Sequence, residues 1–88
     1  LDARIIVKFF DPTGSWTWYA TEYDPEHQEF FGYVSGHDNE LGYFTLAELQ
    51  SVKCAFGLGI ERDLYFNNKT VKDIPQEHMP RFMLKAEA

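Results

Sequence analysis

The stretch GSWTWYATEYDPEHQEFFGYVSG, residues 14–36, holds two aromatic-rich runs on either side of a short polar break. Trp16–Tyr23 and Glu29–Ser35 are rich in aromatic and β-branched residues, a composition typical of β-strands. The DPEHQ segment between them has the length and the residue types of a hairpin loop. We therefore predict an antiparallel hairpin as the main element of the fold.

A register that places Tyr23 opposite Glu29 sorts the side chains of this hairpin onto two faces, because neighbours along a strand alternate. One face carries Trp16, Trp18, Ala20, Phe30, Gly32 and Val34, with Glu22 at its edge. The other face carries Thr17, Tyr19, Thr21, Tyr23, Phe31 and Tyr33, with Glu29. The first face is almost wholly apolar, and we expect it to form the core.

The second face joins aromatic rings to hydroxyl groups, which suits a surface that is partly covered and partly wet. Tyrosine-rich surfaces of this kind are favoured in protein recognition. We take the large side chains of this face as candidate protein-binding residues: Tyr19, Tyr23, Phe31 and Tyr33. The alternative is that these rings only stabilise the sheet, or lie under the tail from Val71 to Leu84.

The rest of the chain adds shorter elements. We predict strands over Ala3–Phe10, Leu41–Phe44 and Ile60–Phe66 from their alternation and β-branched content. Thr45 and Glu48 are spaced as a capping box, ahead of a short amphipathic helix with Leu46, Leu49 and Val52 along one stripe. Pro75 and Pro80 interrupt the tail, where we expect one short helical turn and a frayed end. Residues 1–88 therefore form a single α+β domain with a mostly antiparallel sheet of about five strands.

Composition limits the classes of function. The formal net charge is -6, and the basic residues are scattered, so direct binding to a nucleic-acid backbone is disfavoured. An acidic surface instead serves solubility or docks on a basic protein patch.

The single cysteine, Cys54, excludes an intrachain disulfide and fits a reducing compartment. No apolar run reaches the roughly 18 to 20 residues that span a bilayer, and Leu1–Phe10 lacks a signal-peptide layout, so we expect a cytoplasmic protein.

Signals for catalysis are sparse. His27 and His37 stand at opposite ends of the predicted hairpin, about 25 Å apart, too far to share a metal ion. Glu61 and Asp63 are two apart on a predicted strand and would face the same way. The alternative interpretation of the chain is therefore a small enzyme or a nucleic-acid-processing accessory that uses this edge. Cys54 is interpreted as a structural side chain, because only Lys53 is a nearby basic partner. We expect no catalytic residue, metal or cofactor.

Four motifs occur in an order that resembles one known family: WTWY from residue 16, FFGYV from 30, GYFTLAEL from 42 and IERD from 60. This succession, from about Ile5 to Phe66, is similar to the DUF2958 family of small bacterial proteins of unknown function; residues 67–88 fall outside it. Members of the family often accompany plasmid or integrative-element genes. The resemblance implies an accessory protein of a mobile element, and it carries over no catalytic residue.

Taken with the acidic charge, the resemblance leads us to expect a non-enzymatic protein-binding module. One specific form of this role is an inhibitor of a host complex that handles nucleic acid or serves in defence. The partner would be a foreign protein or, through a two-fold contact, a second copy of the chain.

Overall fold

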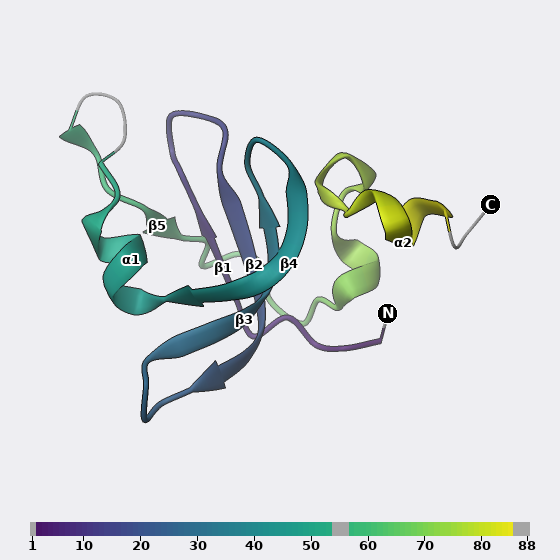
Figure 1. Ribbon diagram of the computed structural model, residues 1–88, viewed down its shortest axis with the longest axis horizontal. Coiled ribbons are helices and arrows are strands. Elements are labelled where there is room, and N and C mark those ends of the chain that lie inside the picture. Colours follow the sequence, from purple (N-terminus) through teal and green to yellow (C-terminus); the bar gives the residue numbers. More distant parts are fainter. Residues whose placement is uncertain (1, 54–56, 86–88) are drawn as a thin grey trace.

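The computed structural model describes residues 2–53 and 57–85 (Figure 1). Within these residues, five strands form one antiparallel sheet in the order β4-β3-β2-β1-β5. The strands are β1 (Val7–Phe10), β2 (Thr17–Asp24), β3 (Glu29–Ser35), β4 (Asn39–Thr45) and β5 (Glu61–Arg62). The helical elements are α1 (Leu46–Ser51), the 3-10 turns η2 (Val71–Asp73) and η3 (Gln76–His78), and α2 (Arg81–Lys85). The predicted α+β class is confirmed, with its antiparallel sheet, short helix and C-terminal helical turn.

The helix α1 begins at the predicted capping box. The Glu48 backbone N–H donates to the Thr45 hydroxyl at 3.0 Å, and the Thr45 N–H donates to the Glu48 carboxylate at 3.1 Å. These bonds occupy donors that the start of a helix would otherwise leave unpaired. The cap fixes the direction of α1, which packs Leu49 against the sheet.

Side chains from the sheet and α1 form one apolar cluster, which we call the α1-side core. Its buried members are Trp18, Ala20, Phe30, Phe44 and Leu49, and Val7, Phe9, Trp16, Val34, Leu46 and Ile60 pack against them. The Phe30 ring lies 5.4 Å from the rings of both Phe9 and Phe44. The apolar face that we predicted for the hairpin is thus the one that contacts α1.

The register of the hairpin is as predicted only over its first part. Trp18 pairs with Val34, Tyr19 with Tyr33 and Ala20 with Gly32, as expected. A β-bulge then follows, because Thr21 is left without a partner on β3 and its hydroxyl donates to the Phe31 carbonyl at 3.2 Å. Beyond the bulge Tyr23 pairs with Phe30 instead of Glu29, so the predicted register there is wrong. A bulge adds one residue to one strand and reverses the faces of the residues that follow.

The first predicted strand is shorter than expected. Of Ala3–Phe10, only Val7–Phe10 lies in the sheet. The residues before β1 pair with the C-terminal tail: the Ile5 N–H donates to the Lys69 carbonyl at 2.9 Å, and the Val71 N–H donates to the Ala3 carbonyl at 3.0 Å. The start of the chain therefore holds the tail in place.

The predicted strand Ile60–Phe66 shortens to the two residues of β5. The chain turns away from the sheet here because the Asp63 carboxylate accepts a hydrogen bond from the Tyr65 N–H at 2.9 Å. This contact is an Asx turn, which competes with strand pairing. By contrast, β4 is longer than the predicted Leu41–Phe44 and spans Asn39–Thr45.

The C-terminal tail covers the face of the sheet opposite α1 (Figure 1). Together with the sheet it forms the tail-side core, whose buried members are Ile5, Tyr19, Tyr33, Val71, Ile74 and Met79, with Phe66 and Met83 packed against them. In the described part of the tail, three short helical elements replace the single turn that we expected, and Pro75 and Pro80 separate them. The domain therefore has three layers, with the sheet in the middle.

Within residues 2–53 and 57–85, no helix is long and apolar enough to cross a bilayer. Cys54, which we interpreted as a structural side chain, lies outside the described residues.

Candidate functional site

Two of the four residues assigned to the protein-binding face are buried by the protein's own tail. Tyr19 is 0% exposed and Tyr33 is 8% exposed, and both pack against Val71, Ile74 and Met79. The expectation that Tyr19 and Tyr33 form an open contact surface is wrong for this structure. Both rings instead lie under the C-terminal tail, which was the alternative interpretation of this face.

The other two residues reach the surface on opposite faces of the sheet. Tyr23 packs on Phe30 with ring centroids 4.6 Å apart, on the face of the α1-side core. Phe31 packs on Tyr43 at 4.9 Å, on the face where Tyr33 pairs with Leu41. The bulge at Thr21 causes this separation, since it turns Tyr23 to the other face. The four rings do not form one surface.

Under the tail, Tyr19 meets a histidine. The Tyr19 hydroxyl and Nδ1 of His78 are hydrogen bonded at 2.7 Å. Burial raises the pKa of Tyr19 to about 12, with a further contribution from the nearby charges of Glu77 and Asp63, so the hydroxyl keeps its proton at neutral pH. Burial also lowers the pKa of His78, which favours the neutral imidazole. The pair is therefore uncharged and suits a covered position.

Asp63, one of the two carboxylates of the alternative enzymatic site, is held by a lysine. Lys8 Nζ lies 3.4 Å from the Asp63 carboxylate, 5.5 Å from the centre of the Tyr19 ring and 5.0 Å from that of Phe66. Glu61 pairs with Phe10 on β1, and the Asp63 N–H donates to the carbonyl of Lys8, two positions before Phe10 on the same strand. Glu61 and Asp63 therefore lie along the same stretch of sheet edge. Their catalytic use stays a prediction.

The three histidines have separate partners. His27 Nδ1 lies 2.7 Å from the Asp24 carboxylate, and this contact raises the pKa of His27 and lowers that of Asp24. His37 packs edge-on against Trp16, with ring centroids 5.4 Å apart.

The exposed hairpin tip brings three possible metal ligands together. Their ligand atoms lie within 4.8 Å of one another, and they belong to Asp24, Glu26 and His27. The Asp24 carboxylate already makes hydrogen bonds within this turn, since it accepts the Glu26 N–H at 3.0 Å and contacts His27 Nδ1.

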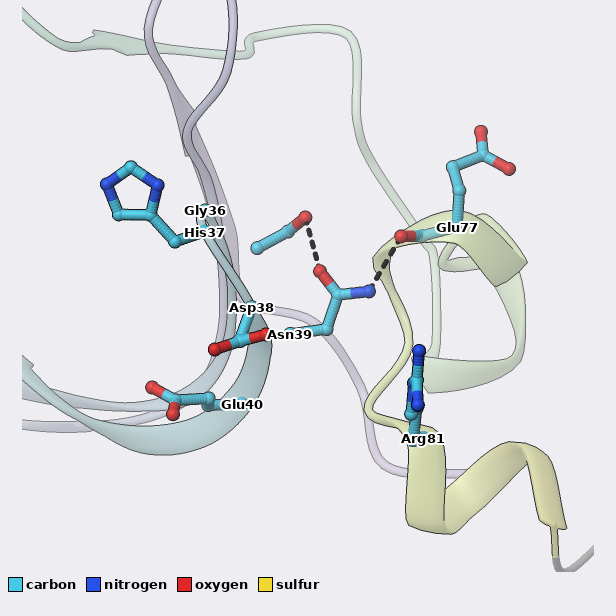
Figure 2. Close-up of a pocket in the computed structure, with 8 residues that line it drawn as sticks. Gly36, His37, Asp38, Asn39, Glu40, Glu77 and Arg81 are labelled. Atoms are coloured by element: carbon cyan, nitrogen blue, oxygen red, sulfur yellow. Dashed lines mark hydrogen bonds between the residues drawn. The ribbon is translucent and has the colours of Figure 1, made fainter.

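A polar pocket lies where the tail meets the turn between β3 and β4 (Figure 2). It has a volume of about 480 Å³ and is lined by Ser35, Gly36, His37, Asp38, Asn39, Glu40, Glu77 and Arg81. Asn39 spans it: its side-chain amide donates to the carbonyls of Glu77 at 2.7 Å and Met79 at 3.1 Å, and its oxygen accepts from Ser35 at 2.8 Å. Asn39 thus fastens the tail to the sheet.

An apolar groove of about 300 Å³ lies on the other face, between β4 and α1. Its lining is mostly aromatic and aliphatic: Trp16, Trp18, Val34, Leu41, Gly42, Tyr43, Phe44, Leu49 and Val52. Glu40 and Glu48 are its charged lining residues. Apolar walls with a few fixed charges are typical of binding sites, and this volume is near the lower end, about 300 Å³, of small-molecule pockets. The groove therefore suits individual side chains better than a large cofactor.

A protein-family model described as "Protein of unknown function (DUF2958)" matches residues 1–73. The chain belongs to the DUF2958 family. No curated protein matches the chain, and no solved structure matches it. Within this DUF2958 protein, every residue that lines the apolar groove falls inside the matched range, whereas Glu77 and Arg81 of the polar pocket fall outside it.

The edge strand β4 of the DUF2958 sheet has a regular alternation of peptide groups. In an antiparallel ladder, successive residues point their N–H and C=O alternately toward the neighbouring strand and away from it. The Leu46 N–H donates to the Gln28 carbonyl at 3.0 Å, on the β3 side. The Thr45 N–H instead points outward, to the Glu48 carboxylate. Even-numbered residues of β4 therefore face β3, and odd-numbered residues face the outer edge.

Leu41 and Tyr43 consequently present their peptide groups along the outer edge of β4. Among the described residues, β3 is the only strand that pairs with β4, so this edge is open. Their side chains are also accessible, with Tyr43 70% and Leu41 38% exposed. The edge and the apolar groove adjoin, because both residues line the groove.

Sequence reasoning did not find this surface. The strand was expected over Leu41–Phe44, but its place at the edge of the sheet depends on the order of all five strands. The groove depends on how closely α1 approaches β4. The available signal was the alternation of Glu40, Gly42 and Phe44 with Leu41 and Tyr43, which predicts a strand with two different faces.

Proposed function

We propose that this DUF2958 protein is a non-enzymatic protein-binding module that adds an extended segment of a partner to the outer edge of β4. The observation that carries the proposal is the pair of outward-facing peptide groups at Leu41 and Tyr43 beside the apolar groove. Strand addition gains its affinity from main-chain hydrogen bonds and its specificity from pockets for alternate side chains. The outer edge of β4 offers outward-facing main-chain groups at Leu41 and Tyr43, and the adjoining groove offers a pocket for side chains.

The edge lacks most of the devices by which proteins protect exposed strands. Edge strands are usually short, carry lysine or proline, or are covered by another element. β4 has seven residues, NELGYFT, without lysine or proline, and Glu40 is its single charge. An open strand of this length fits a docking role better than a protected surface.

Charge defines the class of partner. The chain has a net charge of -6, and the charged residues of the groove are both glutamates, Glu40 and Glu48. A segment that carries lysine or arginine would be attracted to this edge, and an acidic one would be repelled. The same charge supports the narrower role of an inhibitor that occupies a basic surface of a complex that handles nucleic acid. The single cysteine, Cys54, supports a cytoplasmic setting.

The test selects ligands from a display library of random linear peptides and measures their affinities by fluorescence anisotropy. The variant Tyr43→Pro removes the outward N–H without touching the β3 ladder, and Tyr43→Thr is the matched control that keeps the N–H and removes the ring. We expect Tyr43→Pro to bind at least about tenfold more weakly than Tyr43→Thr, because it loses a hydrogen bond and its ring obstructs the incoming strand. Equal affinities of two folded variants would refute strand addition at β4.

A further inference from the structure

We infer that the segment bound at β4 carries an apolar residue followed, two positions later, by lysine or arginine. This inference rests on the proposed function, because it assigns side chains to the strand that β4 would bind. It follows from where the groove and the Glu40 carboxylate lie along β4. It therefore defines a partner by chemistry, as an extended basic segment with one apolar anchor.

The apolar position lies opposite Gly42. Gly42 pairs with Gly32 on β3, on the face that carries Phe30, Val34 and the α1-side core. A Cβ built on Gly42 meets no atom within 4 Å, so the space above this residue is open. A partner residue directly across from Gly42 would direct its side chain to this same face, because cross-strand neighbours share a face. An aliphatic or aromatic side chain there would enter the groove between β4 and α1.

The basic position lies opposite Glu40. Side chains alternate, so the partner residue two positions from the apolar one returns to the groove face. Directly opposed residues of an antiparallel pair have Cβ atoms about 4.5 to 5.5 Å apart, close enough for an ion pair. Figure 2 shows the carboxylates of Asp38 and Glu40 directed to the same side of the view, away from Arg81. Of these two carboxylates, Glu40 lines the groove itself, whereas Asp38 lines the neighbouring polar pocket.

The order of the two residues follows from strand direction. Every strand pair of the sheet is antiparallel, and we extend this pattern to the added strand. A segment antiparallel to β4 passes Gly42 before it passes Glu40. The apolar residue thus precedes the basic one, and the reversed order would place the charge at the Phe44 end.

The test uses synthetic threonine-rich peptides, each with one leucine and one lysine separated by a single threonine. The leucine-first peptide should bind at least about fivefold more tightly than the lysine-first peptide at low salt, and the difference should shrink at high salt. The variant Glu40→Lys should lose this preference, and a peptide with glutamate in place of lysine should then bind it better. Glu61→Lys on β5 is the control with the same change of net charge, and it should leave the preference intact.

The outcomes separate this inference from the proposed function. If Tyr43→Pro weakens binding but Glu40→Lys acts no differently from Glu61→Lys, strand addition stands and the assigned motif is overturned. Equal binding of the two peptide orders also overturns the motif. If Tyr43→Pro has no effect on any peptide, the proposed function itself fails. A dimer of the free protein that Tyr43→Pro dissociates would make a second copy the occupant of the edge, and would overturn the inference.

Discussion

The Tyr19 hydroxyl and Nδ1 of His78 are hydrogen bonded at 2.7 Å across 59 residues of sequence. Tyr19 lies in β2 and His78 ends η3, so this bond ties the tail to the middle of the sheet. Both groups are uncharged at neutral pH, because burial raises the pKa of Tyr19 to about 12 and lowers that of His78. The tail is therefore attached by a neutral pair as well as by apolar packing.

Tyr19→Phe should destabilise the protein by about 1 kcal/mol, because it removes this hydrogen bond and leaves a partly buried nitrogen without its partner. Urea unfolding at pH 7.5 measures the change. Tyr33→Phe is the control, since the Tyr33 hydroxyl makes no side-chain hydrogen bond within the described part of the chain. Equal losses in the two variants would show that the Tyr19–His78 bond contributes nothing of its own.

The stability of the protein should fall in acid partly through His78. Its pKa is lowered in the folded state, so the unfolded chain binds a proton near the ordinary pKa of 6.5 while the folded chain resists it. The stability that neutral His78 contributes is full above pH 6.5 and is lost as the pH falls through the folded pKa. His78→Gln should flatten this part of the pH profile of unfolding.

NMR titration of the imidazoles gives an independent check. Asp24 raises the pKa of His27, so His27 should titrate at higher pH than His78. The reverse order would contradict the burial of His78 beneath the tail. A tail that detaches in solution would also bring the His78 pKa back to its ordinary value.

Asn39→Ala should loosen the tail, because Asn39 donates to the carbonyls of both Glu77 and Met79. We expect a loss of about 1 to 3 kcal/mol in the free energy of unfolding, together with faster amide exchange in η3. Asn67→Ala is the matched control, since the Asn67 amide makes one local bond to the Leu64 carbonyl in an exposed loop. If both variants unfold at the same urea concentration, Asn39 does not fasten the tail.

Gly32 and Gly42 are paired across β3 and β4 but differ in what surrounds them. A Cβ on Gly32 would collide with the Tyr19 backbone carbonyl, whereas a Cβ on Gly42 meets nothing within 4 Å. Gly32→Ala should therefore cost roughly 1 to 3 kcal/mol of stability, and Gly42→Ala should be neutral or slightly stabilising. Thermal denaturation of the two variants compares them directly, and an equal effect would contradict the close approach of β2 and β3.

Local patterns of the sequence were sufficient for several elements. The capping box at Thr45 was predictable because its partners are three residues apart. The core face of the hairpin followed from alternation, and Trp18 opposite Val34 confirms it. The family was recognisable from the order of four short motifs.

The bulge at Thr21 was not predictable from alternation, because a continuous strand and a bulged strand read alike until their partners are known. Its consequence was large, since it moved Tyr23 to the other face. The burial of Tyr19 and Tyr33 depends on a tail whose contacts come from distant residues such as Ile5 and Asn39. The open edge of β4 likewise depends on the strand order of the whole sheet.

Hydrogen–deuterium exchange of the Leu41 and Tyr43 amides, with and without the leucine-first peptide, tests strand addition at β4 most directly. In the free protein both amides should exchange faster than those of Gly42 and Phe44, which face β3. Saturation with peptide should slow the Leu41 and Tyr43 amides at least about tenfold, because they acquire main-chain partners. A bound peptide that leaves both amides fast would contradict the account.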